Sequence, residues 1–401
     1  MTSYSAPKEK AKAILSIAAW WPEGTHVGGV FIREHVEAVA DHYQMIVVHG
    51  IVNKGNSLWP SIRISSSIEN GIPVHRIKIH TWLRRFGMAA YLIRRSYRKV
   101  IDKVARQYDL RLMHIHVRTD ETEQAKAIAR DLDLPIVITE HNTFYNLGLA
   151  TLEAKSREQK RKAVHDWFDD RRIHKVMPVS EDLANTLKEV FGVSENKIRV
   201  IPNIAAPMFK PVPHPATGRF QLMLAAYWRP VKDHNVFIDA LKLMPNNLVD
   251  HCTIIWGGTG PSMDHIRERC EKELPNVDIR FTGHLEKEAM AEFMQSSDVF
   301  LLPTTCENLP CVIAESLSCG TPVISMKLNG IPEMVNEYNG ILVPPRAAIE
   351  LAEAITTVMR SPERFNRSSI ASNAQKRYSV EAVADQILEV YNEVLLEHRS
   401  G

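Results

Sequence analysis

Residues 298–326 read DVFLLPTTCENLPCVIAESLSCGTPVISM. An apolar run at 298–303 is followed by a loop, a helical segment at 310–319 and a second apolar run at 321–326. Pro310 marks the start of the helical segment, because proline is favoured in the first turn of a helix. Apolar runs that alternate with helices are typical of parallel sheets covered on both faces. This stretch therefore predicts one strand–helix–strand unit of an α/β fold.

The same alternation extends through the rest of the chain. Candidate strands lie at 13–19, 45–50, 74–79, 112–117, 135–141, 175–180, 197–201, 220–226, 252–256, 277–283 and 340–345. Helices are expected at about 30–42, 88–107, 121–131, 181–191, 234–244, 262–273 and 286–296, and throughout the tail 346–398. Residues 202–218 carry five prolines and interrupt the pattern, as a linker does. We therefore expect two doubly wound, Rossmann-like domains with the ligand in the cleft between them.

Composition narrows the class of protein. A length of 401 residues suits two or three domains, and 45% apolar with 24% charged residues is ordinary for a soluble protein. The net charge of +2 argues against a dedicated nucleic-acid binder. Lys and Arg outnumber Asp and Glu by eight in residues 1–200 and are outnumbered by six in residues 201–401. Two domains with different partners would explain this asymmetry.

The basic excess of the first half peaks in residues 82–106, where arginines and lysines interleave with apolar and aromatic residues. Two interpretations have equal weight. The segment contacts an anionic membrane surface peripherally, or it is a solvated helix face.

The cysteines and the first residues of the chain indicate the cellular compartment of the protein. All five cysteines lie in the second half and none forms a CxxC pair, which argues against a disulfide framework or a zinc site. The first residues lack the apolar core of a signal peptide, and no run approaches ~20 apolar residues. We expect a cytoplasmic protein, at most peripheral at the inner face of the plasma membrane. The DLD at 131–133 precedes a strand, so we expect a helix-ending turn there and no metal.

Two glutamates in the opening stretch carry candidate chemistry. Glu307 lies in the loop after a strand, and Glu315 lies inside the following helix. A helix start beyond a strand offers free backbone N–H groups and a positive dipole end, which suit a phosphate. Carboxylates nearby can accept hydrogen bonds from sugar and ribose hydroxyls. One strand–loop–helix unit could thus hold a nucleotide sugar, although for an isolated pair two solvated glutamates would be the better explanation.

The wider context resembles the C-terminal signature of retaining glycosyltransferases of the GT-B fold, glycosyltransferase family 4 (group 1). The matching pieces are ENLP at 307–310, Glu315, CGTPVI at 319–324, GIPEMV at 330–335 and NGILVPP at 339–345, and residues 176–211 resemble the bridge into the family's linker. The family usually has Gly-Phe or Gly-Leu where Asn308-Leu309 stands here. The resemblance implies that Glu307 contacts the donor sugar and Glu315 the ribose. It also places the backbone of Asn308, Leu309, Pro310 and Cys311 against the sugar and diphosphate.

The resemblance also defines domain bounds. It implies an N-terminal acceptor-binding domain at 1–203, a linker at 204–218 and a nucleotide-sugar-binding domain at 219–379. The final helix, within 380–401, crosses back to the first domain in this family.

Further site residues follow from matched positions. Lys232 fits a family lysine that faces the diphosphate, whereas Tyr227 occupies the family's arginine position and Arg229 lies two residues on. Gly28 and Gly29 resemble the family's Gly-Gly loop, and glycines let backbone amides approach a ligand closely.

One histidine matches a family position as well. His141, at the end of the strand 135–141, matches the active-site histidine near the donor sugar, with Glu140 and Asn142 as neighbours that orient it. His114 and His116 are expected to pack inside their strand, and Asn203 is expected only to turn the linker.

The resulting hypothesis is a metal-independent, cofactor-free retaining glycosyltransferase. It moves a sugar from a nucleotide-diphosphate sugar to an acceptor hydroxyl on a glycan or a lipid-linked molecule, in bacterial-type surface polysaccharide or glycolipid assembly, and it binds no nucleic acid. The alternatives are a non-catalytic nucleotide-sugar-binding protein, a GT-B nucleotide-sugar epimerase, or a sugar phosphorylase.

Overall fold

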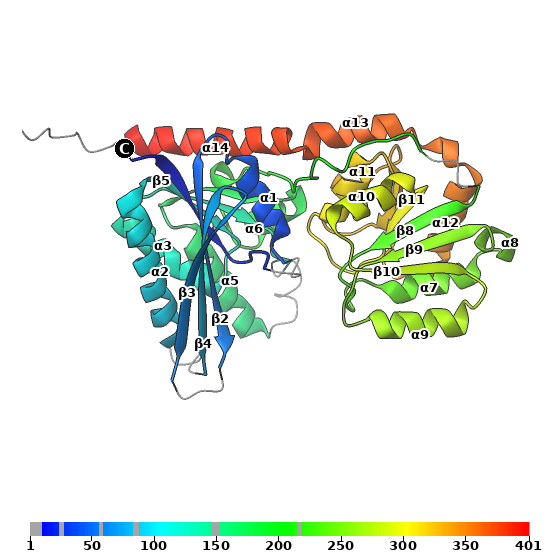
Figure 1. Ribbon diagram of the computed structural model, residues 1–401, viewed down its shortest axis with the longest axis horizontal. Coiled ribbons are helices and arrows are strands. Elements are labelled where there is room, and N and C mark those ends of the chain that lie inside the picture. Colours follow the sequence, from blue (N-terminus) through cyan, green and yellow to red (C-terminus); the bar gives the residue numbers. More distant parts are fainter. Residues whose placement is uncertain are drawn as a thin grey trace, which may run out of the picture.

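The computed structural model has two lobes, each built on one sheet (Figure 1). It describes residues 10–23, 28–55, 59–82, 88–143, 145, 153–214 and 218–400. The first lobe carries a seven-stranded sheet in the order β3-β4-β2-β1-β5-β6-β7. Its elements are β1 (Lys12–Ala18), α1 (Val30–Ala38), β2 (Gln44–Lys54), β3 (Ser61–Glu69), β4 (Ile72–Thr81), α2 (Met88–Gln107), β5 (Asp109–His116), α3 (Asp120–Asp131), β6 (Ile136–Glu140), α5 (Ala154–Phe168), β7 (Ile173–Pro178) and α6 (Glu181–Glu189).

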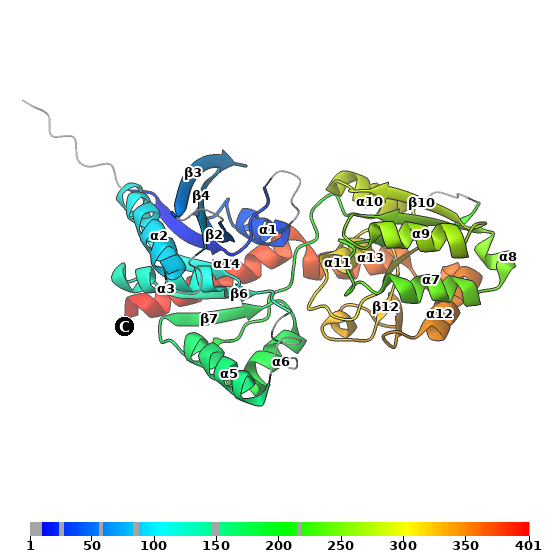
Figure 2. The same cartoon turned by 90° about the horizontal axis from the view of Figure 1, so that it is seen from below.

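The second lobe carries a six-stranded parallel sheet in the order β10-β9-β8-β11-β12-β13. Its elements are β8 (Phe220–Ala225), α7 (His234–Leu243), α8 (Asn246–Val249), β9 (Cys252–Gly257), α9 (Met263–Glu273), β10 (Asp278–Gly283), α10 (Lys287–Ser296), β11 (Val299–Leu302), α11 (Cys311–Ser318), β12 (Val323–Met326), β13 (Gly340–Val343), α12 (Ala348–Arg360), α13 (Arg367–Tyr378) and α14 (Val380–Ser400). Helices lie on both faces of this sheet (Figure 2).

Alternation along β1 shows why both faces of the first sheet are covered. Leu15 and Ile17 belong to the core cluster under α2 and α3, whereas Ile14 and Ala18 belong to the cluster under α1 and α14. Successive side chains of a strand point to opposite faces, so an uninterrupted apolar run needs a cover on each side. The expected doubly wound fold is confirmed.

The last helix leaves the second lobe and packs along the first (Figure 1). The Tyr391 hydroxyl and Nδ1 of His114 in β5 are 2.6 Å apart, and Lys175 of β7 pairs with Glu393 at 2.6 Å. The predicted crossing of the C-terminal helix is therefore confirmed. Among the described residues, no helix combines the length and the apolar character needed to cross a bilayer.

Several elements of the structure differ from the sequence predictions, and one of them is α5, which was not predicted. β3 was not predicted, although Ile62, Ile64 and Ile68 share one face of its sequence SIRISSSIE. It pairs antiparallel with β4 at the sheet edge, where nearly all of its side chains are exposed. Residues 197–201 form no strand, because only Ile198 bridges to Val176. The tail is not one continuous helix, since a 3-10 turn at Pro362–Arg364 and the cap residue Ser379 divide it into α12, α13 and α14.

Candidate functional site between the two sheets

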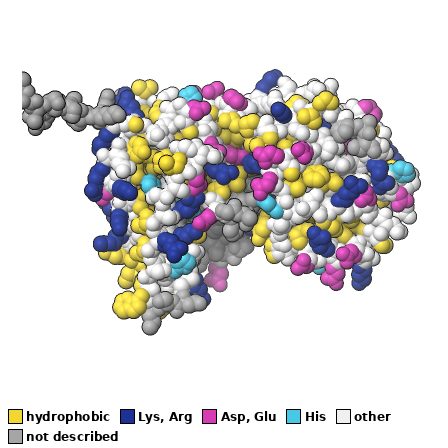
Figure 3. Space-filling view, in the orientation of Figure 1, with side chains coloured by type: hydrophobic (Ala, Val, Ile, Leu, Met, Phe, Trp, Pro, Cys, Tyr) yellow, Lys and Arg dark blue, Asp and Glu magenta, His cyan; other side chains and the backbone are white. Residues whose placement is uncertain are grey.

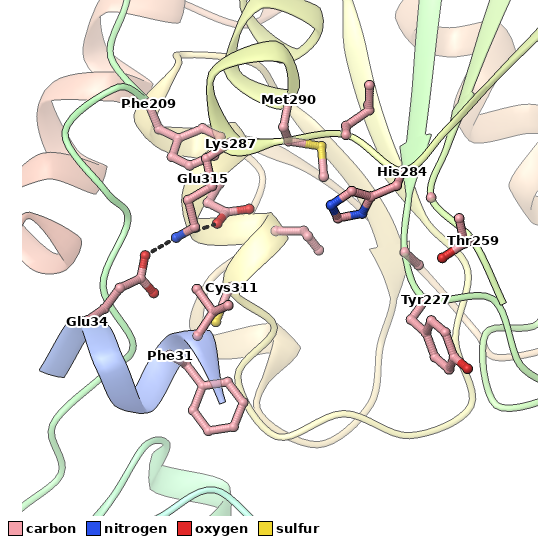
Figure 4. A pocket seen from close by; sticks show the side chains of 15 residues that line it. Phe31, Glu34, Phe209, Tyr227, Thr259, His284, Lys287, Met290, Cys311 and Glu315 are labelled. Atoms are coloured by element: carbon pink, nitrogen blue, oxygen red, sulfur yellow. Dashed lines mark hydrogen bonds and ion pairs between the residues drawn. The ribbon is translucent and has the colours of Figure 1, made fainter. Parts of the chain in front are cut away.

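The candidate site lies where loops at the carboxyl ends of strands from both sheets meet. A cavity of about 260 Å³ opens between the lobes, lined by α1 of the first lobe and by loops and helix starts of the second (Figure 4). Acidic and basic side chains gather at the same junction on the surface (Figure 3). Its lining residues are Val30, Phe31, Glu34, Phe209, Ala226, Tyr227, Gly258, Thr259, His284, Leu285, Lys287, Met290, Cys311, Val312 and Glu315.

Gly29 starts α1 at the edge of this cavity. Its φ of +90° lies in the left-handed region, and a Cβ atom there would stand 2.6 Å from the backbone carbon of Trp20. Only glycine fits that conformation and that close approach. The turn directs the start of α1, and with it Phe31 and Glu34, toward the second lobe.

An ion pair joins the two loops that carry predicted site residues of the second lobe. The ammonium of Lys232, after β8, bonds the carboxylate of Glu307, after β11, and each side chain is only 15% exposed. Thr304 and Thr305 bond the carbonyl of Val231 at 3.1 and 2.9 Å, which holds the loops together. The structure thus brings Lys232 and Glu307 into direct contact beside the start of α11.

A chain of three charged groups crosses the cavity from one lobe to the other. Lys287 at the start of α10 bonds Glu34 of α1, and its ammonium lies 4.0 Å from the carboxylate of Glu315 (Figure 4). Burial raises the pKa of Glu315 to about 7; Lys287 opposes this and Glu34 adds to it. Burial also raises the pKa of Glu34. Burial lowers the pKa of Lys287, but the two carboxylates outweigh it and the pKa is raised.

The loop that carries Asn308 and Leu309 is joined to neighbouring parts of the chain by two asparagine side chains, each of which donates to a backbone carbonyl. Nδ2 of Asn308 donates to the carbonyl of His141 at 2.8 Å, and Nδ2 of Asn203 donates to the carbonyl of Leu309 at 2.6 Å. Both asparagine side chains are about 95% buried. Asn308, the departure from the family pattern, therefore holds the strand end that bears His141.

The turn at His141 is shaped by its neighbour Glu140. The buried Glu140 carboxylate accepts the amides of Arg118, His141 and Asn142 and the hydroxyl of Tyr145, all within 3.1 Å. Burial raises the pKa of Glu140, and these four donors oppose that change. The expectation that Glu140 orients His141 matches this geometry.

Two family models divide the chain between them. Residues 29–205 match Glycosyltransferase Family 4, and residues 209–377 match Glycosyl transferases group 1. The chain belongs to these glycosyltransferases.

Relatives of this glycosyltransferase are distant in sequence. Glycogen synthase of Mycobacterium tuberculosis is 25% identical over 274 residues, which make up 67% of this chain and 65% of that protein. Phosphatidyl-myo-inositol mannosyltransferase of Mycobacterium leprae is 26% identical over 295 residues, 71% of this chain and 74% of the relative. A crystal structure of Anabaena HepE in complex with UDP aligns with a TM-score of 0.70 at 19% identity, covering 95% of this chain and all of the other. The last likeness supports the GT-B fold.

The structure brings some of the predicted site residues into the lining of the cavity and leaves others outside it. Cys311 and Glu315 line the cavity, while Leu309 and Pro310 are buried at the start of α11. Burial raises the pKa of the Cys311 thiol well above its usual range, so this group stays protonated. Arg229 and Gly28 are exposed and do not line the cavity, and Tyr227 is half exposed at its rim.

Four further residues of the glycosyltransferase were missed as contributors to the site. Glu34, Lys287 and Asn203 join the lobes as described above. The carboxylate of Glu333 accepts the amides of Glu181 and Asp182 at 2.9 and 2.8 Å and so caps α6 across the interface. Glu333 belongs to the quoted GIPEMV piece, which was the one signal that could have drawn attention to it.

Proposed function

We propose that the protein is a retaining glycosyltransferase that uses a nucleotide-diphosphate sugar. The observation that carries the proposal is the grouping of the Lys232–Glu307 pair and Glu315 around the start of α11, beside a cavity shared by both lobes. A helix start with a nearby cation stabilises a diphosphate, and buried carboxylates accept ribose and sugar hydroxyls. The likeness to HepE, whose structure contains UDP, supports a nucleotide donor.

In the proposed transfer step, the acceptor oxygen bonds the anomeric carbon on the face from which the diphosphate leaves. The bond between that carbon and the diphosphate oxygen breaks, and a phosphate oxygen of the donor takes the acceptor's proton. Lys232 and the backbone N–H groups at the start of α11 stabilise the charge that grows on the leaving diphosphate. Such preorganised groups typically contribute ~10²–10³ in rate each. We propose that this step needs no cofactor or metal.

A thermal-shift screen against UDP-, GDP- and ADP-sugars identifies the donor, and product analysis tests the reaction. We expect a free nucleoside diphosphate and a glycoside whose anomeric configuration, read by NMR, equals that of the donor. An inverted configuration would contradict the retaining mechanism. A released epimer would favour an epimerase, and donor binding without turnover on any acceptor would favour a non-catalytic binding protein.

We further propose a glycan or lipid-linked acceptor, as in surface polysaccharide or glycolipid assembly. The relative named phosphatidyl-myo-inositol mannosyltransferase supports this class of acceptor. The part of the basic segment at 83–87 lies outside the described residues, but α2 presents exposed cations at Arg94, Arg95 and Lys99, and Tyr91 beside them is 58% exposed. These side chains suit an anionic membrane surface.

Flotation with vesicles of neutral lipid, with and without phosphatidylglycerol, tests the membrane contact. Each cation near the surface contributes about 1 kcal/mol. The double variant Arg94→Ala/Arg95→Ala should therefore bind anionic vesicles weakly, whereas a control with two exposed cations removed from the second lobe, Lys272→Ala/Arg360→Ala, should bind like the parent. Equal binding by both variants would assign the segment to a solvated helix face.

A further inference from the structure

Three histidines from separate elements of the first lobe converge behind the cleft. His35 lies on α1, His116 ends β5, and His141 follows β6. One ring nitrogen from each lies within 4.8 Å of the others. His35 and His116 are at least 99% buried, and His141 is partly buried.

Several ring nitrogens in this cluster lack a hydrogen-bond partner. Among the described residues, neither nitrogen of His116 nor Nδ1 of His35 has a hydrogen-bond partner. The ring of His141 is not free in the same way, because the side chain of Asn203 interacts with it. Buried polar atoms are nearly always paired, so unpartnered nitrogens on two adjacent buried histidines point to a bound group.

The neighbouring His114 shows what a buried structural histidine looks like here. Its ring stacks on His116 at 3.8 Å, yet its Nδ1 contacts Tyr391 and its Nε2 contacts Thr139, so both nitrogens are used. His114 is accordingly not one of the three. His114 and His116 lie on the same strand, but only His116 has ring nitrogens without hydrogen-bond partners.

The orientation of His35 is that of a metal ligand. Its Nε2 lies 3.0 Å from the carbonyl of Pro202, which can only accept, so Nε2 carries the proton and Nδ1 presents a lone pair. Metal-binding histidines commonly donate their other N–H to a carbonyl in this way. The ring is thus fixed with its free nitrogen in the cluster.

The donor set defines the class of ion. All three side chains offer imidazole nitrogens, which bind metals in their neutral form. The nearby Glu140 carboxylate is occupied by four donors. Imidazole nitrogens without carboxylates suit zinc-like ions and not magnesium or calcium.

We propose that His35, His116 and His141 bind one divalent transition-metal ion of the zinc class. Tetrahedral zinc holds nitrogens at about 2.0–2.1 Å and therefore about 3.3 Å from one another, so nitrogens now up to 4.8 Å apart need to close by up to about 1.5 Å. Three protein ligands leave a fourth position for water. The ion would tie the helix that follows Gly29 to the strand end that bears His141. It involves none of the residues proposed to hold the diphosphate, whereas His141 is also the residue expected beside the donor sugar.

The experiment uses full-length protein without an affinity tag, treated with chelator and titrated with Zn²⁺ and with Co²⁺. We expect one tightly bound equivalent, a visible Co²⁺ spectrum of a four- or five-coordinate site, and X-ray absorption that fits three imidazole nitrogens. Absence of stoichiometric metal binding, or an octahedral spectrum of hydrated Co²⁺, would overturn the proposal. A water molecule would then be the group that bridges the histidine nitrogens. These readouts need neither a donor sugar nor activity, so they are independent of the proposed function.

Variants locate the ion. His116→Asn and His35→Gln should lose the bound equivalent. The matched control is His234→Asn, which removes another buried histidine with an unpartnered Nε2, in the second lobe, and it should retain the equivalent. If all three variants retain the bound metal ion, the ion binds elsewhere on the protein and the assignment to these histidines is wrong. If a cluster variant fails to fold, the Co²⁺ spectrum and absorption fit of the parent protein decide.

Discussion

The raised pKa of Glu315 leads to two opposite pH effects that one substitution can separate. The pKa is about 7 in the folded protein against 4.5 for an unperturbed glutamate. A group with a raised pKa contributes stability that is complete below about pH 4.5 and is lost as the pH rises through 7. At 1.36 kcal/mol per pKa unit, the ionised carboxylate costs the folded state about 3 kcal/mol at pH 8. Glu315→Gln should therefore stabilise the protein at pH 8 and have little effect at pH 5.

Donor binding should respond in the other direction, because the ionised carboxylate is the form that accepts both ribose hydroxyls. One pH unit below the pKa only about a tenth of the group is ionised, so donor affinity should fall about tenfold between pH 8 and pH 6. Calorimetry with a nucleotide sugar suits this test, since its pyrophosphate does not titrate in that range. Glu315→Gln should bind weakly and without this pH dependence.

Other groups facing Glu315 must be separated from it. Lys287, Glu34 and Cys311 are its charged or titratable neighbours, and His284 lines the same cavity. His284→Asn is the matched control and should keep the pH dependence of the parent. Urea unfolding midpoints at pH 5 and 8 measure the stability effect. A Glu315→Gln protein less stable than the parent at pH 8, or a parent whose donor affinity is flat between pH 6 and 8, would refute the reasoning.

Three further substitutions test other parts of the site. Lys232→Ala should lower kcat by ~10²–10³, as measured by steady-state kinetics. The control Lys210→Ala removes an exposed lysine of the linker and should leave kcat unchanged. If both variants have the same kcat, Lys232 has no part in the mechanism. Glu333→Ala removes the carboxylate that caps α6, so the free energy of unfolding should fall by about 0.5–2 kcal/mol. Urea denaturation measures this fall against the control Glu333→Gln, which keeps a hydrogen-bond acceptor. An unchanged midpoint in Glu333→Ala would show that the cap contributes no net stability. Gly29→Ala should destabilise the fold by more than about 1 kcal/mol, because its Cβ would overlap the Trp20 backbone at a left-handed φ, and a melting temperature equal to that of the parent would argue against this strain.

Much of the fold could be predicted because local sequence and global topology agree. The buried strands are short apolar runs, and the capped helices between them leave few alternatives, as Ser180 before α6 shows: its side chain accepts the amide of Leu183. β3 was missed because the other strands are near-continuous apolar runs, whereas this exposed edge strand carries only Ile62, Ile64 and Ile68 among polar residues, the alternating pattern of a strand that is not covered on both faces.

The site could be predicted only in part, for a different reason. Glu307 and Lys232 lie in loops after strands, and Glu315 lies in the helix that follows one, so their place at the sheet edge is a property of the local chain. Glu34 and Lys287 lie 253 positions apart, and each looks like an ordinary solvated helix residue until the two lobes meet. The three histidines of the proposed metal site likewise come from three elements, and no spacing in the sequence connects them.

A crystal structure with a bound nucleotide-diphosphate sugar tests the central claim most directly. We expect the ribose hydroxyls to contact Glu315, the pyrophosphate to lie between Lys232 and the start of α11, and the sugar to lie beside Glu307 and His141. A nucleotide sugar bound outside the cavity between the lobes, or in the cavity with its pyrophosphate away from Lys232, would contradict it.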